Sequence, residues 1–129
     1  MRMRLPARFA AAGLAFVALL AAGCGAVPPQ APLAYAKKLD SATSGISTVC
    51  GSAYQVTAFP GNHISDLDGL EASAIRYARR LETVFHRNRE WIYQGDTVAE
   101  ISSDAVAMLE SCGLHRAATQ LRRATTAST

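Results

Sequence analysis

Apolar residues recur every three or four positions over three successive stretches, and this period constrains the fold more than any other feature of the chain. Such spacing places the apolar side chains on one face of an α-helix, whereas a half-buried strand alternates every second residue. We predict helices over residues 33–50, from 65 to between 87 and 93, and from 96–97 to 112. The predicted fold class is all-α: a small three-helix up-down-up bundle, to which a short fourth helix over 115–123 could be added.

Start and stop signals support these helix bounds. A Ser or Thr followed three residues later by an acidic residue caps the free N–H groups of a helix start, and a Gly just past the last turn ends many helices. The start signals are Pro32, Ser65 with Asp68, and Thr97 with Glu100, and the end signals are Gly51 and Gly113, with Leu114 packing back. The stripe of the third helix expected to face the core is Val98, Ile101, Ala105, Met108, Leu109 and Cys112.

The N-terminus has the layout of a secretory signal. Three arginines precede a 14-residue apolar stretch, residues 9–22, and small residues follow it. A helix that spans a bilayer needs about 20 apolar residues, so this stretch is too short for a comfortable span. A basic start, a short apolar region and small residues at the cleavage point are the three parts of a signal peptide. Residues 1–23 are therefore predicted to be removed.

The end of this stretch, Leu19-Leu20-Ala21-Ala22-Gly23-Cys24, resembles the signal of bacterial lipoproteins. The resemblance implies that the Cys24 thiol accepts a diacylglyceryl group and that Cys24, which can also be N-acylated, becomes the mature N-terminus. It implies a lipid-anchored protein on the extracytoplasmic face of the cell membrane, and leaves inner or outer membrane open. The alternative is an ordinary secretory signal that is cut after Gly23 without lipid attachment.

Removal of the signal leaves a mature chain of three segments with a different net charge. The Pro-rich residues 24–32 are predicted to form a tether, residues 33–124 a helical domain and residues 125–129 a disordered tail. The three arginines that leave with the signal reduce 13 basic residues to ten, which matches the ten acidic residues. A formally neutral mature chain gives no support for nucleic-acid binding.

With Cys24 assigned to lipid, Cys50 and Cys112 remain as an even pair in an oxidising compartment, and we predict one disulfide between them. In an up-down-up bundle the first and third helices are parallel, so their C-terminal cysteines meet at one end. A zinc site formed by Cys50, Cys112, His63 and His115 is the alternative. The close ligand pairs of strong zinc signals are absent, so neither a metal nor a cofactor is predicted.

Two groups of residues are candidate contact surfaces. Arg76, Arg80 and Arg87 lie off the apolar stripe of the second helix. They form either a solvated face or a contact with anionic lipid headgroups, wall polymers or an acidic protein. Trp91 and Tyr93 are expected at the tethered end, either at the membrane interface or as a cap on the core.

No catalytic pattern stands out in the sequence. It has no G-x-S-x-G elbow, no Gly-rich phosphate loop and no strong motif of paired carboxylates, so we predict no enzyme. The expected function is interaction, as an accessory protein of the cell envelope, because helical bundles offer grooves and faces to partners. The alternative is a lipoprotein that binds a solute, a metal or a wall polymer. The partner and the oligomeric state stay open.

Overall fold

The computed structural model describes residues 29–58 and 64–126 and is mostly helical. The predicted signal peptide, Cys24, His63 and residues 127–129 lie outside the described residues. The elements are α2 (Leu33–Ala58), α3 (Ile64–Asn88), β1 (Ile92–Tyr93), β2 (Asp96–Thr97), α4 (Val98–Ser111) and α5 (His115–Thr126). The prediction of a mostly helical domain with one disulfide, between Cys50 and Cys112, is confirmed.

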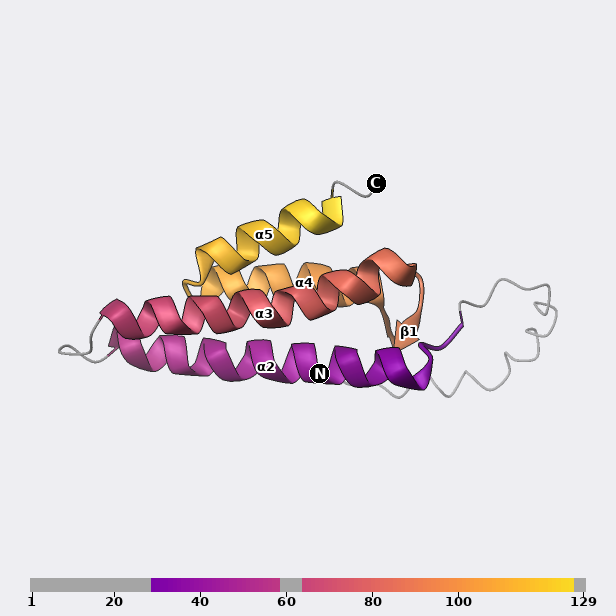
Figure 1. Cartoon of the computed structure of the whole chain (residues 1–129), viewed down its shortest axis with the longest axis horizontal. Helices are drawn as coiled ribbons and strands as arrows, with labels where there is room; N and C mark the ends of the chain where they lie inside the picture. Colours follow the sequence, from indigo (N-terminus) through magenta and orange to yellow (C-terminus); the bar gives the residue numbers. More distant parts are fainter. Residues whose placement is uncertain (1–28, 59–63, 127–129) are drawn as a thin grey trace, which may run out of the picture.

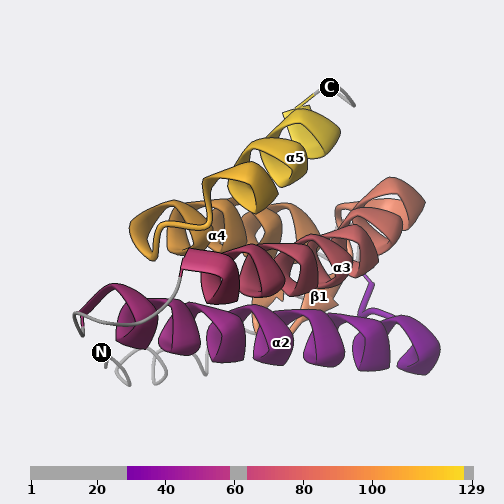
Figure 2. The same ribbon diagram turned by 60° about the vertical axis from the view of Figure 1, so that its left-hand side comes forward.

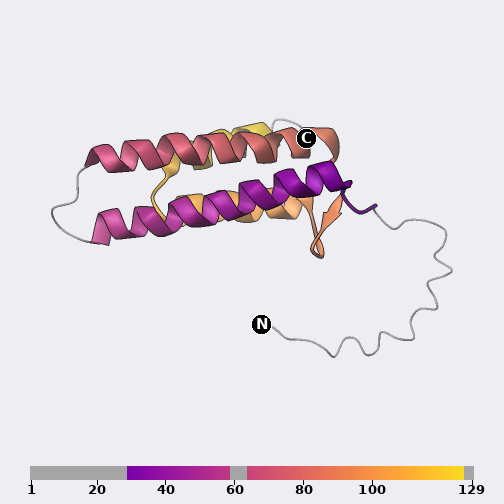
Figure 3. The same ribbon diagram turned by 60° about the horizontal axis from the view of Figure 1, so that its bottom comes forward.

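The core lies around α3, which contacts each of the other helices in the described part of the chain. Figures 1 and 3 show α2 and α3 side by side over most of their length. Figure 2 shows α5 above α4 and α3, and its inner face is apolar. The largest side chains with less than 2% exposure are Leu39, Ile46, Leu81, Leu109, Leu114 and Leu121.

Helix α2 is eight residues longer than predicted, because Gly51 does not end it. The helix continues to Ala58, and Ala53 in the added turns is fully buried. A glycine inside a helix costs about 1 kcal/mol relative to alanine. Burial of Ala53 and the disulfide at Cys50 both stabilise the part of α2 around Gly51, and so oppose this cost. The predicted C-cap at Gly51 is therefore wrong.

Helix α4 has both of its predicted ends. The Thr97 hydroxyl accepts from the Glu100 N–H, and the Glu100 carboxylate accepts from the Thr97 N–H, which is a complete capping box. At the other end Gly113 has a φ of 90°, and the Leu114 N–H donates to the Leu109 carbonyl. The Gly113 N–H also donates to the Glu110 carbonyl, and the two bonds form a Schellman motif. The fully buried Leu114 packs back as predicted. For α3, which begins at Ile64, the predicted capping box falls on Ser65, whose side chain is outside the described part.

Strands β1 and β2 form a hairpin between α3 and α4 that the sequence analysis did not predict. Gln94 and Gly95 both have positive φ, at 52° and 89°, as a tight two-residue hairpin turn requires. The chain just before α2 joins this hairpin: the Ile92 N–H donates to the Pro29 carbonyl, and the Ala31 N–H donates to the Ile92 carbonyl. The last part of the predicted tether is therefore bound to the domain.

Helix α5 continues to Thr126, so the first two residues of the predicted tail, 125 and 126, are helical. Its own N-terminus is capped by a residue from another helix. Leu114 precedes α5 and offers no side-chain acceptor, but the buried Glu71 of α3 accepts from the Ala117 N–H at 2.7 Å. A carboxylate at a helix start satisfies a free donor and interacts favourably with the helix dipole.

We expect Glu71→Ala to lower the free energy of unfolding by about 2 kcal/mol, because the Ala117 N–H loses a charged acceptor in a buried place. Chemical denaturation followed by circular dichroism measures the loss. Glu71→Gln keeps an oxygen acceptor of the same shape and should lose less than the alanine variant. Equal losses in both variants would contradict the capping role of Glu71.

Candidate functional site

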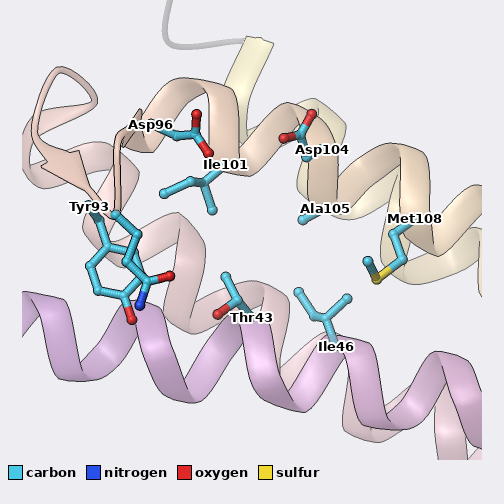
Figure 4. Close-up of a pocket in the computed structure, with 9 residues that line it drawn as sticks. Thr43, Ile46, Tyr93, Asp96, Ile101, Asp104, Ala105 and Met108 are labelled. Carbon is cyan, nitrogen blue, oxygen red and sulfur yellow. The ribbon is translucent and has the colours of Figure 1, made fainter. Parts of the chain in front are cut away.

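A pocket of about 240 Å³ opens between α2, the hairpin and α4, and we call it the α2–α4 pocket. Its apolar lining comes from Ile46 of α2 and from Ile101, Ala105 and Met108 of α4 (Figure 4). Ile46 is almost fully buried beneath it, whereas Met108 is 41% exposed. The expectation that Met108 faces the core is therefore wrong, since its side chain lies at the wall of an open cavity.

Polar residues complete the lining. Thr43 comes from α2, Tyr93, Gln94 and Asp96 come from the hairpin, and Asp104 comes from α4. Figure 4 shows the Asp96 and Asp104 carboxylates on the α4 side of the pocket, and Tyr93 at its hairpin end. The pocket thus has an apolar floor and a polar rim.

Two links join α2 to the opposite side of this pocket, one to the end of α4 and one to the hairpin. At one end the Cys50–Cys112 disulfide joins backbones whose Cα atoms are 5.4 Å apart, and the Cys50 Sγ lies 3.6 Å from the Met108 carbonyl oxygen. At the other end the Tyr93 hydroxyl donates to Asp40 Oδ1 of α2 at 3.3 Å. One covalent link and one hydrogen bond therefore connect the two sides of the pocket.

The rim is negatively charged. Asp40, Asp96 and Asp104 are all exposed. In residues 29–58 and 64–126, no basic side chain lies at ion-pair distance from any of these three carboxylates. The ion pairs present in this part involve His115 and Arg122 with Glu110, and Arg116 with Asp68. Within the described residues, the negative charge of the rim is thus not balanced by an ion pair.

The pKa of the Tyr93 phenol depends on its surroundings at the hairpin end of the pocket. Burial, and then the charge and hydrogen bond of Asp40, raise the pKa of Tyr93 above its ordinary 10.0. Since the raised pKa favours the protonated phenol in the folded state, this contribution to stability is complete below pH 10 and is lost as the pH rises above it.

We expect an NMR titration of ring-labelled tyrosine to show Tyr93 ionising above pH 10, and Asp40→Asn to lower its midpoint. The midpoint should stay above 10, because burial is the larger cause of the shift. Asp104→Asn, which removes a carboxylate not bonded to Tyr93, is the control and should have less effect. An unchanged midpoint in Asp40→Asn would show that the two side chains are not in contact in solution.

The predicted arginine surface is placed on the exposed side of α3. Arg76 donates to Ser73 on its own helix, and Arg80 donates to Ser41 of α2 at 2.5 Å. The Arg87 guanidinium lies 5.9 Å from the centre of the Tyr35 ring. These contacts pack the arginines along α2 and α3, away from the residues that line the α2–α4 pocket.

Trp91 and Tyr93 both lie at the end of the domain where α2 begins, but they have different contacts. Trp91 is half-buried, packs against the core and lies with its ring centre 4.9 Å from that of Tyr35. Tyr93 lines the pocket. Trp91 thus covers the end of the core, which was the alternative to a membrane-interface role in the sequence analysis.

The zinc alternative loses two ligands, because Cys50 and Cys112 are bonded to each other and offer no thiolate. His115 is exposed, and its Nδ1 lies 3.1 Å from a Glu110 oxygen. His63 is outside the described residues. Among the residues that the structure describes, no three His, Cys, Asp or Glu side chains are grouped so as to hold a metal ion.

The chain matches no protein-family model, no curated protein and no solved structure. Within the described ranges, none of the helices is both long enough and apolar enough to cross a bilayer. The structure thus defines a small helical domain with one disulfide and one acidic-rimmed apolar pocket. Sequence reasoning missed this pocket. Its one visible signal was the set of Asp96 and Asp104 beside the apolar stripe of α4.

Proposed function

We propose that this protein is a lipid-anchored interaction module of the bacterial cell envelope, which holds a segment of a protein partner in the α2–α4 pocket. The observation that carries the proposal is the pocket itself: an open apolar cavity between α2 and α4, with the Cys50–Cys112 disulfide at one end and the Tyr93–Asp40 hydrogen bond between the hairpin and α2 at the other. The proposal takes α2, α3 and α4 as an up-down-up bundle. The contact between Tyr35 and Trp91 supports it, since the start of α2 and the hairpin then share an end.

The pocket suits a side chain better than a large ligand. Pockets that enclose drug-sized ligands have volumes of about 300–1,000 Å³. The cavity here, at about 240 Å³, is smaller. Its lining contains two carboxylates and one phenol as possible acids or bases, but neither histidine, cysteine nor lysine. Binding of one or two side chains from a partner is therefore favoured over catalysis on a large substrate.

The proposed anchor would hold the domain close to the bilayer. If Cys24 carries the lipid, five residue steps separate it from Pro29, whose carbonyl is bonded to Ile92. Five extended steps span at most roughly 18 Å. In the proposal the hairpin end is then near the membrane surface, and the pocket faces partners that also lie at that surface.

Substitution of the lipidation cysteine tests the anchor. We expect Cys24→Ala to remove the lipid anchor in the source bacterium. The protein should then be found in the soluble fraction or as the uncleaved precursor. Mass spectrometry should show the loss of the diacylglyceryl mass. A variant that stays wholly with membranes and differs in mass from the wild-type protein only by the Cys-to-Ala change itself would overturn the anchor.

A photo-reactive residue tests the interaction. Placed at Met108 in the full-length protein in its own cells, it should form a discrete cross-link to a protein. The same residue at Thr83, an exposed position on α3 that does not line the pocket, is the matched control. The proposal fails if both positions give the same products, or if neither gives one.

A lipoprotein that captures a small solute is the second candidate, and the small volume of the pocket, about 240 Å³, is the observation in its favour. The cross-linking experiment separates the two. A solute-binding protein gives no protein adduct at Met108, but a small molecule should co-purify with it and shield Met108 from the photo-reaction.

A further inference from the structure

We propose that the segment held in the α2–α4 pocket is cationic as well as apolar: a peptide in which an apolar side chain stands between two Lys or Arg residues. This inference rests on the proposed function, since it names the chemistry of the partner for the same pocket. It combines the apolar floor, the negative rim and the distribution of basic residues over the domain.

The apolar floor of the pocket favours an apolar side chain in the partner. Ile101 and Ala105 of α4 and Ile46 of α2 face one another across the cavity, and Met108 lies at its wall (Figure 4). Burial of apolar surface contributes about 25 cal/mol per Å². Methionine is flexible and polarisable, so Met108 can adapt its shape to an incoming side chain.

The rim requires the charged part. Asp96 and Asp104 line the pocket and Asp40 lies at its hairpin end, bonded to Tyr93. A partner cation gains attraction from these carboxylates without displacing a basic side chain, because none in the described residues is paired with them. In the proposal, the two flanking Lys or Arg side chains reach the carboxylates of the rim, and the apolar side chain between them enters the pocket and contacts its floor.

The positive charge on the exposed side of α3 also favours docking of a cationic segment at the pocket. Arg76, Arg79 and Arg80 are exposed on α3, which does not line the pocket. A cationic segment is therefore repelled from that surface and attracted to the acidic rim. Complementary charge of this kind increases the rate of encounter and selects the docking face.

Methionine NMR on the full-length protein tests the inference. The chain has three methionines: Met108 lines the pocket, and Met1 and Met3 belong to the predicted signal peptide. In protein labelled with ¹³C at the methionine methyl groups, we expect the peptide acetyl-Gly-Arg-Leu-Arg-Gly-amide to shift the Met108 signal in a saturable way. Met1 and Met3, where they are retained, serve as internal references.

Matched peptides and variants separate charge from apolar contact. Acetyl-Gly-Glu-Leu-Glu-Gly-amide and acetyl-Gly-Arg-Ala-Arg-Gly-amide should shift the Met108 signal much less. The double variant Asp96→Asn with Asp104→Asn should raise the Kd of the Arg-Leu-Arg peptide by about three- to tenfold. Asp66→Asn, an exposed carboxylate of α3 away from the pocket, should leave the Kd unchanged.

Three results would overturn the inference. They are no shift with the Arg-Leu-Arg peptide, equal shifts with the Glu-Leu-Glu peptide, and an equal saturable shift with n-butylguanidinium, which would identify a small cation as the occupant. These outcomes are distinct from failure of the proposed function. A protein cross-link at Met108 together with no response to the cationic peptide would keep the interaction and reject only its cationic chemistry.

Discussion

Replacement of both Cys50 and Cys112 by alanine is expected to lower the free energy of unfolding by about 4 kcal/mol, because the link closes a loop of 62 residues. The whole free energy of unfolding of a typical domain is about 5–15 kcal/mol, so the variant should lose a large share of it. The melting temperature should fall by roughly 15–30 °C. Thermal unfolding followed by circular dichroism measures the change.

Cys24→Ala is the matched control for this experiment, since position 24 precedes the helical domain. It should leave the melting temperature of the domain unchanged. A free-thiol count on the native protein completes the test, because the bonded pair should give no reactive thiol. Two reactive thiols, together with an unchanged melting temperature in the double variant, would show that the disulfide does not form.

Gly45→Ala is expected to lower the free energy of unfolding by up to about 2 kcal/mol, although alanine is the better helix former. A Cβ atom at Gly45 would lie 2.4 Å from the Tyr77 ring, which packs against α2. A shift of the ring would also disturb the Arg80 guanidinium, which lies 5.3 Å from the ring centre and donates to Ser41. Overpacking of this kind costs about 1–3 kcal/mol and exceeds the gain of about 1 kcal/mol from helix propensity.

Gly51→Ala, in the same helix, should have the opposite sign. No atom lies within 4 Å of a Cβ at Gly51, which is exposed inside α2. The variant should therefore be more stable by up to about 1 kcal/mol. Urea denaturation of the two variants gives the comparison. A loss of stability in Gly51→Ala would mean that α2 ends at this residue, and a gain in Gly45→Ala would mean that Tyr77 packs elsewhere.

The positions of the helices could be predicted from the sequence because their signals are local. Thr97 and Glu100 are three residues apart, and each satisfies the backbone of the other. Gly113 and Leu114 end α4 within one turn. The length of α2 could not be predicted in this way. Gly51 has the same local signature as Gly113, but burial of Ala53 and the link from Cys50 to a distant helix carry α2 past it.

The pocket could not be predicted because its residues belong to separate elements. Ile101 and Met108 repeat with the period of a core stripe, and nothing near them in the chain indicates that α2 leaves a cavity there. The same holds for Glu71, which caps α5 from 46 residues away.

The sequence by itself determined which segments become helices, where α4 begins and ends, and that two cysteines could close the domain. These features depend on periodicity and on hydrogen bonds within one turn, which neighbouring residues supply. The tertiary structure alone decided that α2 runs past Gly51, that the chain before α2 pairs with Ile92, and that an acidic rim surrounds an apolar floor. Each of these depends on groups far apart in the chain, which come together only when the helices pack.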